Sequence, residues 1–71
     1  MDMEALQPGQ EFTVKEIRDK DNPVLRKLQA MGLKEGRRAK LLLSNGRVFL
    51  LRLNNSRLIL DRDLAKFIEV A

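Results

Sequence analysis

Alternating apolar and polar residues predict several short β-strands along the chain. Within Glu11–Ile17, Phe12 and Val14 share one face, whereas Ile17 falls one residue out of phase, as it would after a bulge. The other predicted strands span residues 38–43, 47–53, 57–60 and 67–70. The chain is therefore expected to be mainly β.

The second and third of these strands are expected to form a hairpin. Ala39, Leu41 and Leu43 alternate with other residues and should lie on one face of the second strand. Asn45 and Gly46 follow, and this dipeptide is a strong signal for a short hairpin turn. The turn should therefore set the register of the two strands.

A short helix is predicted over residues 24–31. Asn22 can cap it with its side-chain oxygen, Pro23 suits the first helical position, and Gly32 favours a left-handed end. The apolar positions along the helix are Val24, Leu25, Leu28 and Met31. A helix this short is marginal alone, so this apolar stripe must pack on something.

Five short strands, one helix between the first two and a helical turn before the last predict a small, partly open SH3-like barrel. Asp61 can cap the helical turn, which would run to Lys66. Closure protects strand edges that a flat sheet of this size would leave exposed. An OB-type barrel is the alternative, although its helix normally lies between later strands. Residues 1–71 are expected to form a single domain, because so short a chain supports one core.

The charge is unevenly distributed along the chain. Residues 1–23 contain six acidic and three basic residues, whereas residues 34–57 contain seven basic residues and one acidic residue. The basic middle of the chain can attract phosphate, anionic headgroups or an acidic protein surface, and its charge alone does not choose among them. No apolar stretch approaches the length of a membrane-spanning helix, and no export signal is evident.

Residues that carry metal or catalytic chemistry are scarce. The chain has no cysteine and no histidine, so thiolate and imidazole ligands are absent. Two acidic pairs stand out, Asp19 with Asp21 and Asp61 with Asp63. Their positions suit a polar loop and a helix cap. Ser44 and Ser56 lie in predicted turns, with no histidine to activate them. We therefore expect no enzyme activity, no cofactor and no iron bound by this chain.

Several motifs together resemble the ferrous iron transport protein A (FeoA) family. The most specific is the Leu-x-x-Met-Gly-Leu-x-x-Gly run, in which one glycine ends the helix and the other turns the chain into the next strand. The matching residues are Pro8, Gly9, Val14, Ile17, Leu28, Met31, Gly32, Leu33, Gly36, Leu60, Asp61, Ala65, Ile68 and Val70. The resemblance spans nearly the whole chain.

The resemblance implies an SH3-like barrel with an accessory role in ferrous iron uptake. Its implied partner is a FeoB-type membrane transporter with a cytosolic G-domain, which this chain would bind and modulate by protein–protein contact. It also implies a cytoplasmic location, with recruitment to the inner face of the membrane by that partner. A sheet edge leaves self-association open.

The predicted helix is the first candidate contact surface. The apolar residues of the helix, together with Leu33 just after it, form a band that is wider than so short a helix needs for packing on one surface. Part of this band could therefore bind another protein. Leu25 and Arg26 are the preferred exposed pair. The alternative is that the band is core, and this is favoured for Leu28 and Met31.

The basic middle of the chain is the second candidate. Arg47, Arg52 and Arg57 recur at spacings of five and could form one positive face together with Arg37, Arg38 and Lys40. Arginines on strand edges more often serve only to keep a sheet soluble.

A nucleic-acid-binding barrel is the alternative function, because the basic segment could contact phosphates. Such modules usually stack bases on aromatic side chains. Phe12, Phe49 and Phe67 all fall at positions suited to the core, and the chain has no tryptophan or tyrosine. Nucleic acid is therefore not the expected partner, and the same shortage argues against recognition of proline-rich peptides.

Overall fold

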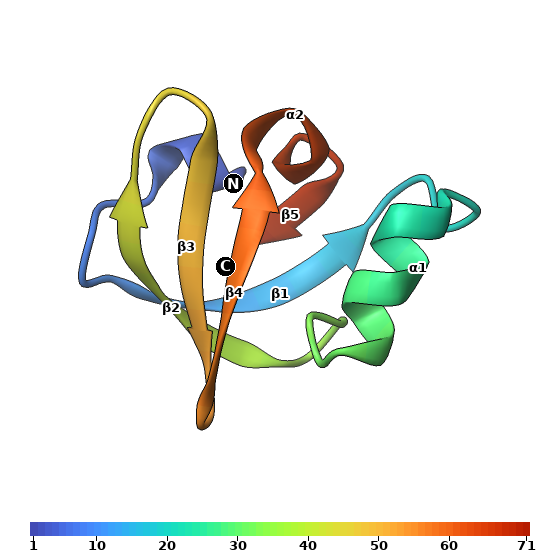
Figure 1. Ribbon diagram of the computed structural model, residues 1–71, viewed down its shortest axis with the longest axis horizontal. Coiled ribbons are helices and arrows are strands. Elements are labelled where there is room, and N and C mark those ends of the chain that lie inside the picture. The colour runs from blue at the N-terminus through green and yellow to red at the C-terminus, as the bar shows by residue number, and fades with distance from the viewer.

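The computed structural model describes residues 1–71 and consists of five short antiparallel strands with small helical elements between them (Figure 1). The elements are η1 (Met3–Ala5), β1 (Glu11–Ile17), α1 (Pro23–Ala30), β2 (Arg38–Ser44), β3 (Val48–Leu53), β4 (Ser56–Asp61), α2 (Arg62–Ala65) and β5 (Ile68–Val70). The predicted mainly β class is confirmed, and no strand bound differs from the prediction by more than one residue.

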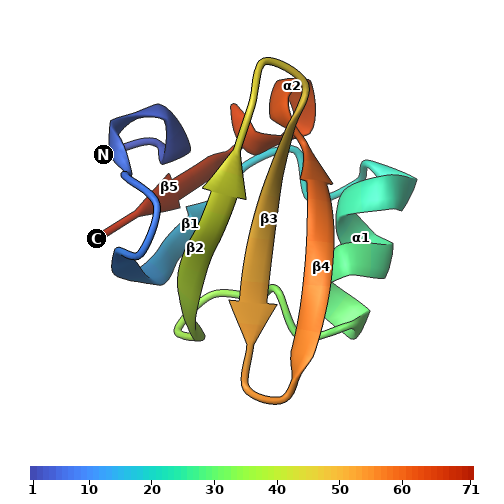
Figure 2. The same cartoon turned by 60° about the vertical axis from the view of Figure 1, so that its left-hand side comes forward.

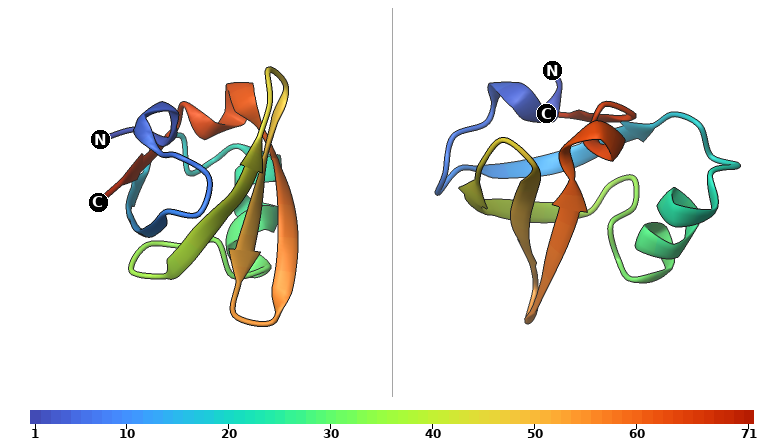
Figure 3. Two further views of the ribbon diagram at one scale, coloured as in Figure 1. Left: turned by 90° about the vertical axis from the view of Figure 1, so that its left-hand side faces the viewer. Right: turned by 45° about the horizontal axis from the view of Figure 1, so that its top comes forward.

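The strands form one sheet in the order β4-β3-β2-β1-β5. Figure 2 shows β2, β3 and β4 as one curved layer with α1 behind it, and Figure 3 shows β1 crossing that layer. The sheet therefore bends into a partly open SH3-like barrel, as predicted. The helix lies on the side of β4 where the barrel is open.

The core contains only apolar side chains. All 18 buried residues are hydrophobic, and no polar or charged residue is buried. Two of them, Met3 and Leu6, belong to the N-terminal segment, for which the apolar pattern predicted no element. The turn of 3-10 helix at Met3–Ala5 carries Met3 into the core, and its shortness explains why no periodicity revealed it.

Bulges in β1 and β2 decide which side chains face outward. In β1 the register shifts between Val14 and Glu16, which confirms the predicted break in phase before the buried Ile17. In β2 the register shifts between Leu41 and Leu43. The expectation that Leu43 shares a face with Leu41 is wrong, because the extra residue turns Leu43 outward, where it is 56% exposed.

Both ends of α1 are capped as predicted. The Asn22 side chain accepts hydrogen bonds from the N–H groups of Val24 and Leu25. At the other end Gly32 has a φ of +113°, and the Leu33 N–H donates to the carbonyl of Leu28, which is a Schellman ending. The caps fix where the chain enters and leaves this eight-residue helix.

A side-chain tether joins the segments on either side of α1. One carboxylate oxygen of Glu35 accepts the Ile17 N–H at 3.1 Å and lies 3.3 Å from the Lys20 ammonium. The hydrogen bond from Ile17, and then the contact with Lys20, lower the pKa of Glu35. The end of β1 is thereby tied to the loop that leads into β2.

The lowered pKa predicts how Glu35→Gln affects stability. A carboxyl group whose pKa is depressed on folding stabilises the protein above its unfolded pKa of about 4.3, and this contribution is lost as the pH falls through the folded value. We expect Glu35→Gln to lower the urea midpoint at neutral pH and the difference from the unmodified protein to shrink in acid. Glu16→Gln is the matched control. It removes an exposed carboxylate that makes no ion pair. Equal effects of the two changes would contradict the tether.

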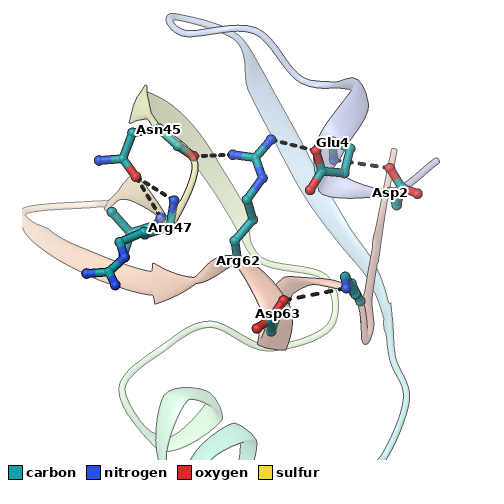
Figure 4. A network of polar contacts seen from close by, with 8 residues as sticks. Asp2, Glu4, Asn45, Arg47, Arg62 and Asp63 are labelled. Carbon is teal, nitrogen blue, oxygen red and sulfur yellow. Dashed lines mark hydrogen bonds and ion pairs between the residues drawn. The ribbon is translucent and has the colours of Figure 1, made fainter.

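Arg62 at the start of α2 connects three parts of the chain (Figure 4). Its guanidinium donates to the Asn45 carbonyl in the β2–β3 turn and to the Glu4 carboxylate in the N-terminal turn. The same group lies 4.5 Å from the centre of the Phe49 ring, which is a cation–π contact. This arginine therefore closes the end of the barrel opposite the β3–β4 turn.

We predict that Arg62→Ala lowers the free energy of unfolding by about 1–3 kcal/mol, because two hydrogen bonds and the contact with Phe49 are lost. Arg47→Ala, a nearby exposed arginine whose side chain makes no hydrogen bond or ion pair, should change it by less than about 0.5 kcal/mol. Urea denaturation followed by circular dichroism measures both. Similar losses of unfolding free energy in the two variants would show that the contacts of Arg62 do not hold these segments together.

Candidate functional site

The helix candidates divide between the core and the surface. Leu25 and Leu33 are each 1% exposed and Leu28 is 9% exposed, whereas Arg26 is exposed and Met31 is 54% exposed. The expectation that Leu25 is exposed is wrong, because Leu25 and Leu28 lie on the one side of α1 that packs inward. The expectation that Met31 is core is also wrong, since Met31 is the C-cap and points away from that side.

Three of the helix candidates are therefore unavailable to a partner in the folded protein. Leu33 is drawn under the helix by the Schellman ending. Met31 remains accessible beside a groove between the end of α1 and the β3–β4 turn, where Lys34, Arg37 and Asn55 also lie.

The buried position of Leu25 leads to a stability prediction. Leu25→Ala should lower the free energy of unfolding by about 2–5 kcal/mol, since it leaves a cavity in the core. Val24→Ala, one residue earlier and 50% exposed, should cost less than about 1 kcal/mol. Thermal denaturation of the pair checks this. A tolerated Leu25→Ala would mean that Leu25 does not pack in the core.

Two of the three candidate arginines meet on the outer face of the sheet. Arg52 of β3 lies directly opposite Arg57 of β4, and Lys40 of β2 lies directly opposite Arg52 on its other side. All three side chains thus belong to one row across the strands. Arg47, in contrast, lies in the β2–β3 turn at the far end of β3 and does not join them.

This basic row has no ionic partner within the chain. None of the five ion pairs includes Lys40, Arg52 or Arg57. Glu11 of β1 lies opposite Lys40, but its carboxylate is 3.0 Å from Arg38 and pairs with that residue. Like charges directly opposite each other destabilise a sheet, so the row is a cost to the free protein.

A second row, which is apolar, runs beside the basic one. Leu43 of β2 lies opposite Leu50 of β3, and Leu50 lies opposite Ile59 of β4. Leu43 is 56% exposed, Ile59 is 66% exposed and Leu50 is partly buried. We call the two rows together the outer-face site, composed of Lys40, Leu43, Leu50, Arg52, Arg57 and Ile59.

Sequence reasoning missed the apolar half of this site. Leu43 was expected to share a face with Ala39 and Leu41, and the pattern gave no reason to single out Ile59. The signal was present in the runs at residues 41–43, 50–51 and 58–60, where apolar residues are consecutive instead of alternating. Such runs indicate apolar side chains on both faces of a strand.

The structure offers neither a metal cluster nor a membrane-spanning helix. No three residues of the types His, Cys, Asp and Glu lie together in a way that could hold a metal ion. No helix is long and apolar enough to cross a membrane. In the outer-face site, exposed apolar side chains adjoin a row of three cationic residues that make no ion pair.

The fold and this surface define the class of the protein as a small SH3-like β-barrel with an amphipathic outer face. The family model of the FeoA domain matches residues 1–71, so the chain belongs to the FeoA domain family. The resemblance inferred from the motifs is thereby confirmed. A search of curated proteins gives no match.

Two solved structures share the fold. The solution structure of iron(II) transport protein A from Clostridium thermocellum has a TM-score of 0.86 at 24% identity, covering 99% of this chain and 44% of that one. The crystal structure of an iron uptake regulatory protein, FeoA, has a TM-score of 0.84 at 22% identity, covering 99% of this chain and 93% of that one. This chain therefore spans less than half the length of the Clostridium protein.

Proposed function

We propose that this protein is an accessory component of ferrous iron uptake that binds and modulates a FeoB-type membrane transporter. Family membership supports the pathway, as do the two structural relatives, described as an iron(II) transport protein and an iron uptake regulatory protein. The outer-face site is the observation that carries the binding role. Leu43 and Ile59 expose apolar surface to water, and the basic row places like charges directly opposite each other.

The site suits contact with another protein more than chemistry on a small molecule. It lies on the surface of three adjacent strands and contains aliphatic and cationic side chains, with no hydroxyl, thiol or carboxylate among them. Aliphatic side chains beside cations can bury apolar area and steer an acidic partner. The nucleotide and the metal would then be held by the transporter.

Nucleic acid remains the second candidate because the basic row could contact phosphates. Phe12 and Phe49 are 2% and 1% exposed, and Phe67 is partly buried against the core, so no aromatic side chain lies on the outer face to stack with bases. Protein contact is therefore favoured.

A binding experiment with two variants tests this proposal. Ile59→Ser should weaken binding to the detergent-solubilised transporter by about tenfold, because the most exposed apolar contact of the site is lost. Met31→Ser, which changes an exposed apolar residue at the end of α1, should leave binding unchanged. Surface plasmon resonance with the full transporter and with its isolated G-domain, with and without nucleotide, measures both.

Three results would count against the proposal. Loss of binding in Met31→Ser alone would place the contact at the helix instead of the sheet. Binding of single-stranded RNA at physiological salt, with no binding of the transporter, would favour the nucleic-acid alternative. No binding of either would reject the transporter as partner.

A further inference from the structure

The geometry of the outer-face site points to the chemistry of the segment that binds it. We infer that this segment is amphipathic and of protein origin, with aliphatic side chains along one side and carboxylates along the adjacent side. The inference rests on the proposed function, because it specifies the partner of the same site.

The basic row calls for carboxylates. Lys40, Arg52 and Arg57 are neighbours across three strands, and Glu11, the acid that lies opposite Lys40 on β1, is engaged by Arg38. An anion from outside the chain would both relieve the repulsion among these side chains and gain charge-assisted hydrogen bonds. Arginine contributes two of the three positions, and its planar group suits a carboxylate in particular.

The apolar row sets the direction in which the segment lies. Leu43, Leu50 and Ile59 succeed one another across the strands, so their row spans two strand spacings, or about 9.6 Å. Along β3 and β4 the two rows are two residues apart, or about 7 Å, whereas along β2 the bulge sets Lys40 and Leu43 three residues apart in the numbering. A helix with a diameter of about 10 Å, laid across the strands, covers both rows at once.

The surroundings of the site argue against two other occupants. A bilayer is best entered by apolar side chains that protrude, but the tips of the two hairpins carry Asn45, Gly46, Asn54 and Asn55. The exposed apolar side chains lie instead on the face of the sheet between those tips. A second copy of the chain would bring another basic row to this face, and like charges would oppose such a dimer.

Backbone amide shifts of the isotope-labelled protein, titrated with two synthetic peptides, test the inference. Each peptide is a helix of about four turns with leucines on one side and either glutamates or lysines on the adjacent side. The glutamate peptide should shift the amides of β2, β3 and β4, and salt should weaken its binding. The lysine peptide should not bind.

A charge reversal provides the matched comparison. Arg52→Glu combined with Arg57→Glu should weaken binding of the glutamate peptide at least about tenfold and should permit binding of the lysine peptide. Arg47→Glu combined with Lys34→Glu makes the same change in net charge away from the site and should alter neither. The same two double variants are then measured against the transporter.

Each alternative outcome is decisive. Equal binding of the two peptides, shifts confined to α1, or equal effects of the two double variants would overturn the inference, even if the transporter binds. Binding to vesicles of phosphatidylglycerol and phosphatidylcholine in place of the peptide, or a concentration-dependent dimer that uses the outer face, would also overturn it. If the glutamate peptide binds as expected and the transporter does not, the proposed function fails and the inferred chemistry stands.

Discussion

Burial of an exclusively apolar inner face is the constraint on which this structure depends. A chain of 71 residues has few side chains with which to build a core, and all 18 buried residues are apolar. The curved sheet supplies most of them, α1 covers its open side with Leu25 and Leu28, and the N-terminal turn adds Met3. Caps, bulges and side-chain tethers serve this arrangement by fixing where each short element begins.

The outer face of the same sheet, in contrast, carries both charged and apolar side chains. There the neighbours across the strands are three cations in one row and three aliphatic residues in the next. The basic row opposes the stability of the free protein, and natural sequences tend to depart from locally favourable choices where function requires it. The contrast between the two faces of β3 is the strongest reason for connecting this surface with binding.

Much of the fold could be predicted from the sequence because its signals are local. Asn22, Pro23 and Gly32 mark the ends of a helix, Asn45 with Gly46 marks a hairpin, and each signal depends only on nearby residues.

The position of Leu43 could not be predicted in this way. It depends on a bulge in the pairing of β2 with β3, and pairing is not visible along one strand. The helix residues were misjudged for a related reason, since periodicity identifies an apolar side of α1 but not how much of it the sheet covers.

The bulge in β2 has a wider consequence. Leu42 is one additional residue in β2. Without it the second strand would be regular, and Leu43 would not lie beside Leu50 on the outer face. In a strand, a single insertion or deletion exchanges the two faces from that point onward. Homologous barrels of nearly identical composition could therefore gain or lose this recognition surface by a change in spacing alone. An alignment that tolerates a gap at this position would conceal that difference, so the length of this strand deserves as much weight as the residues within it.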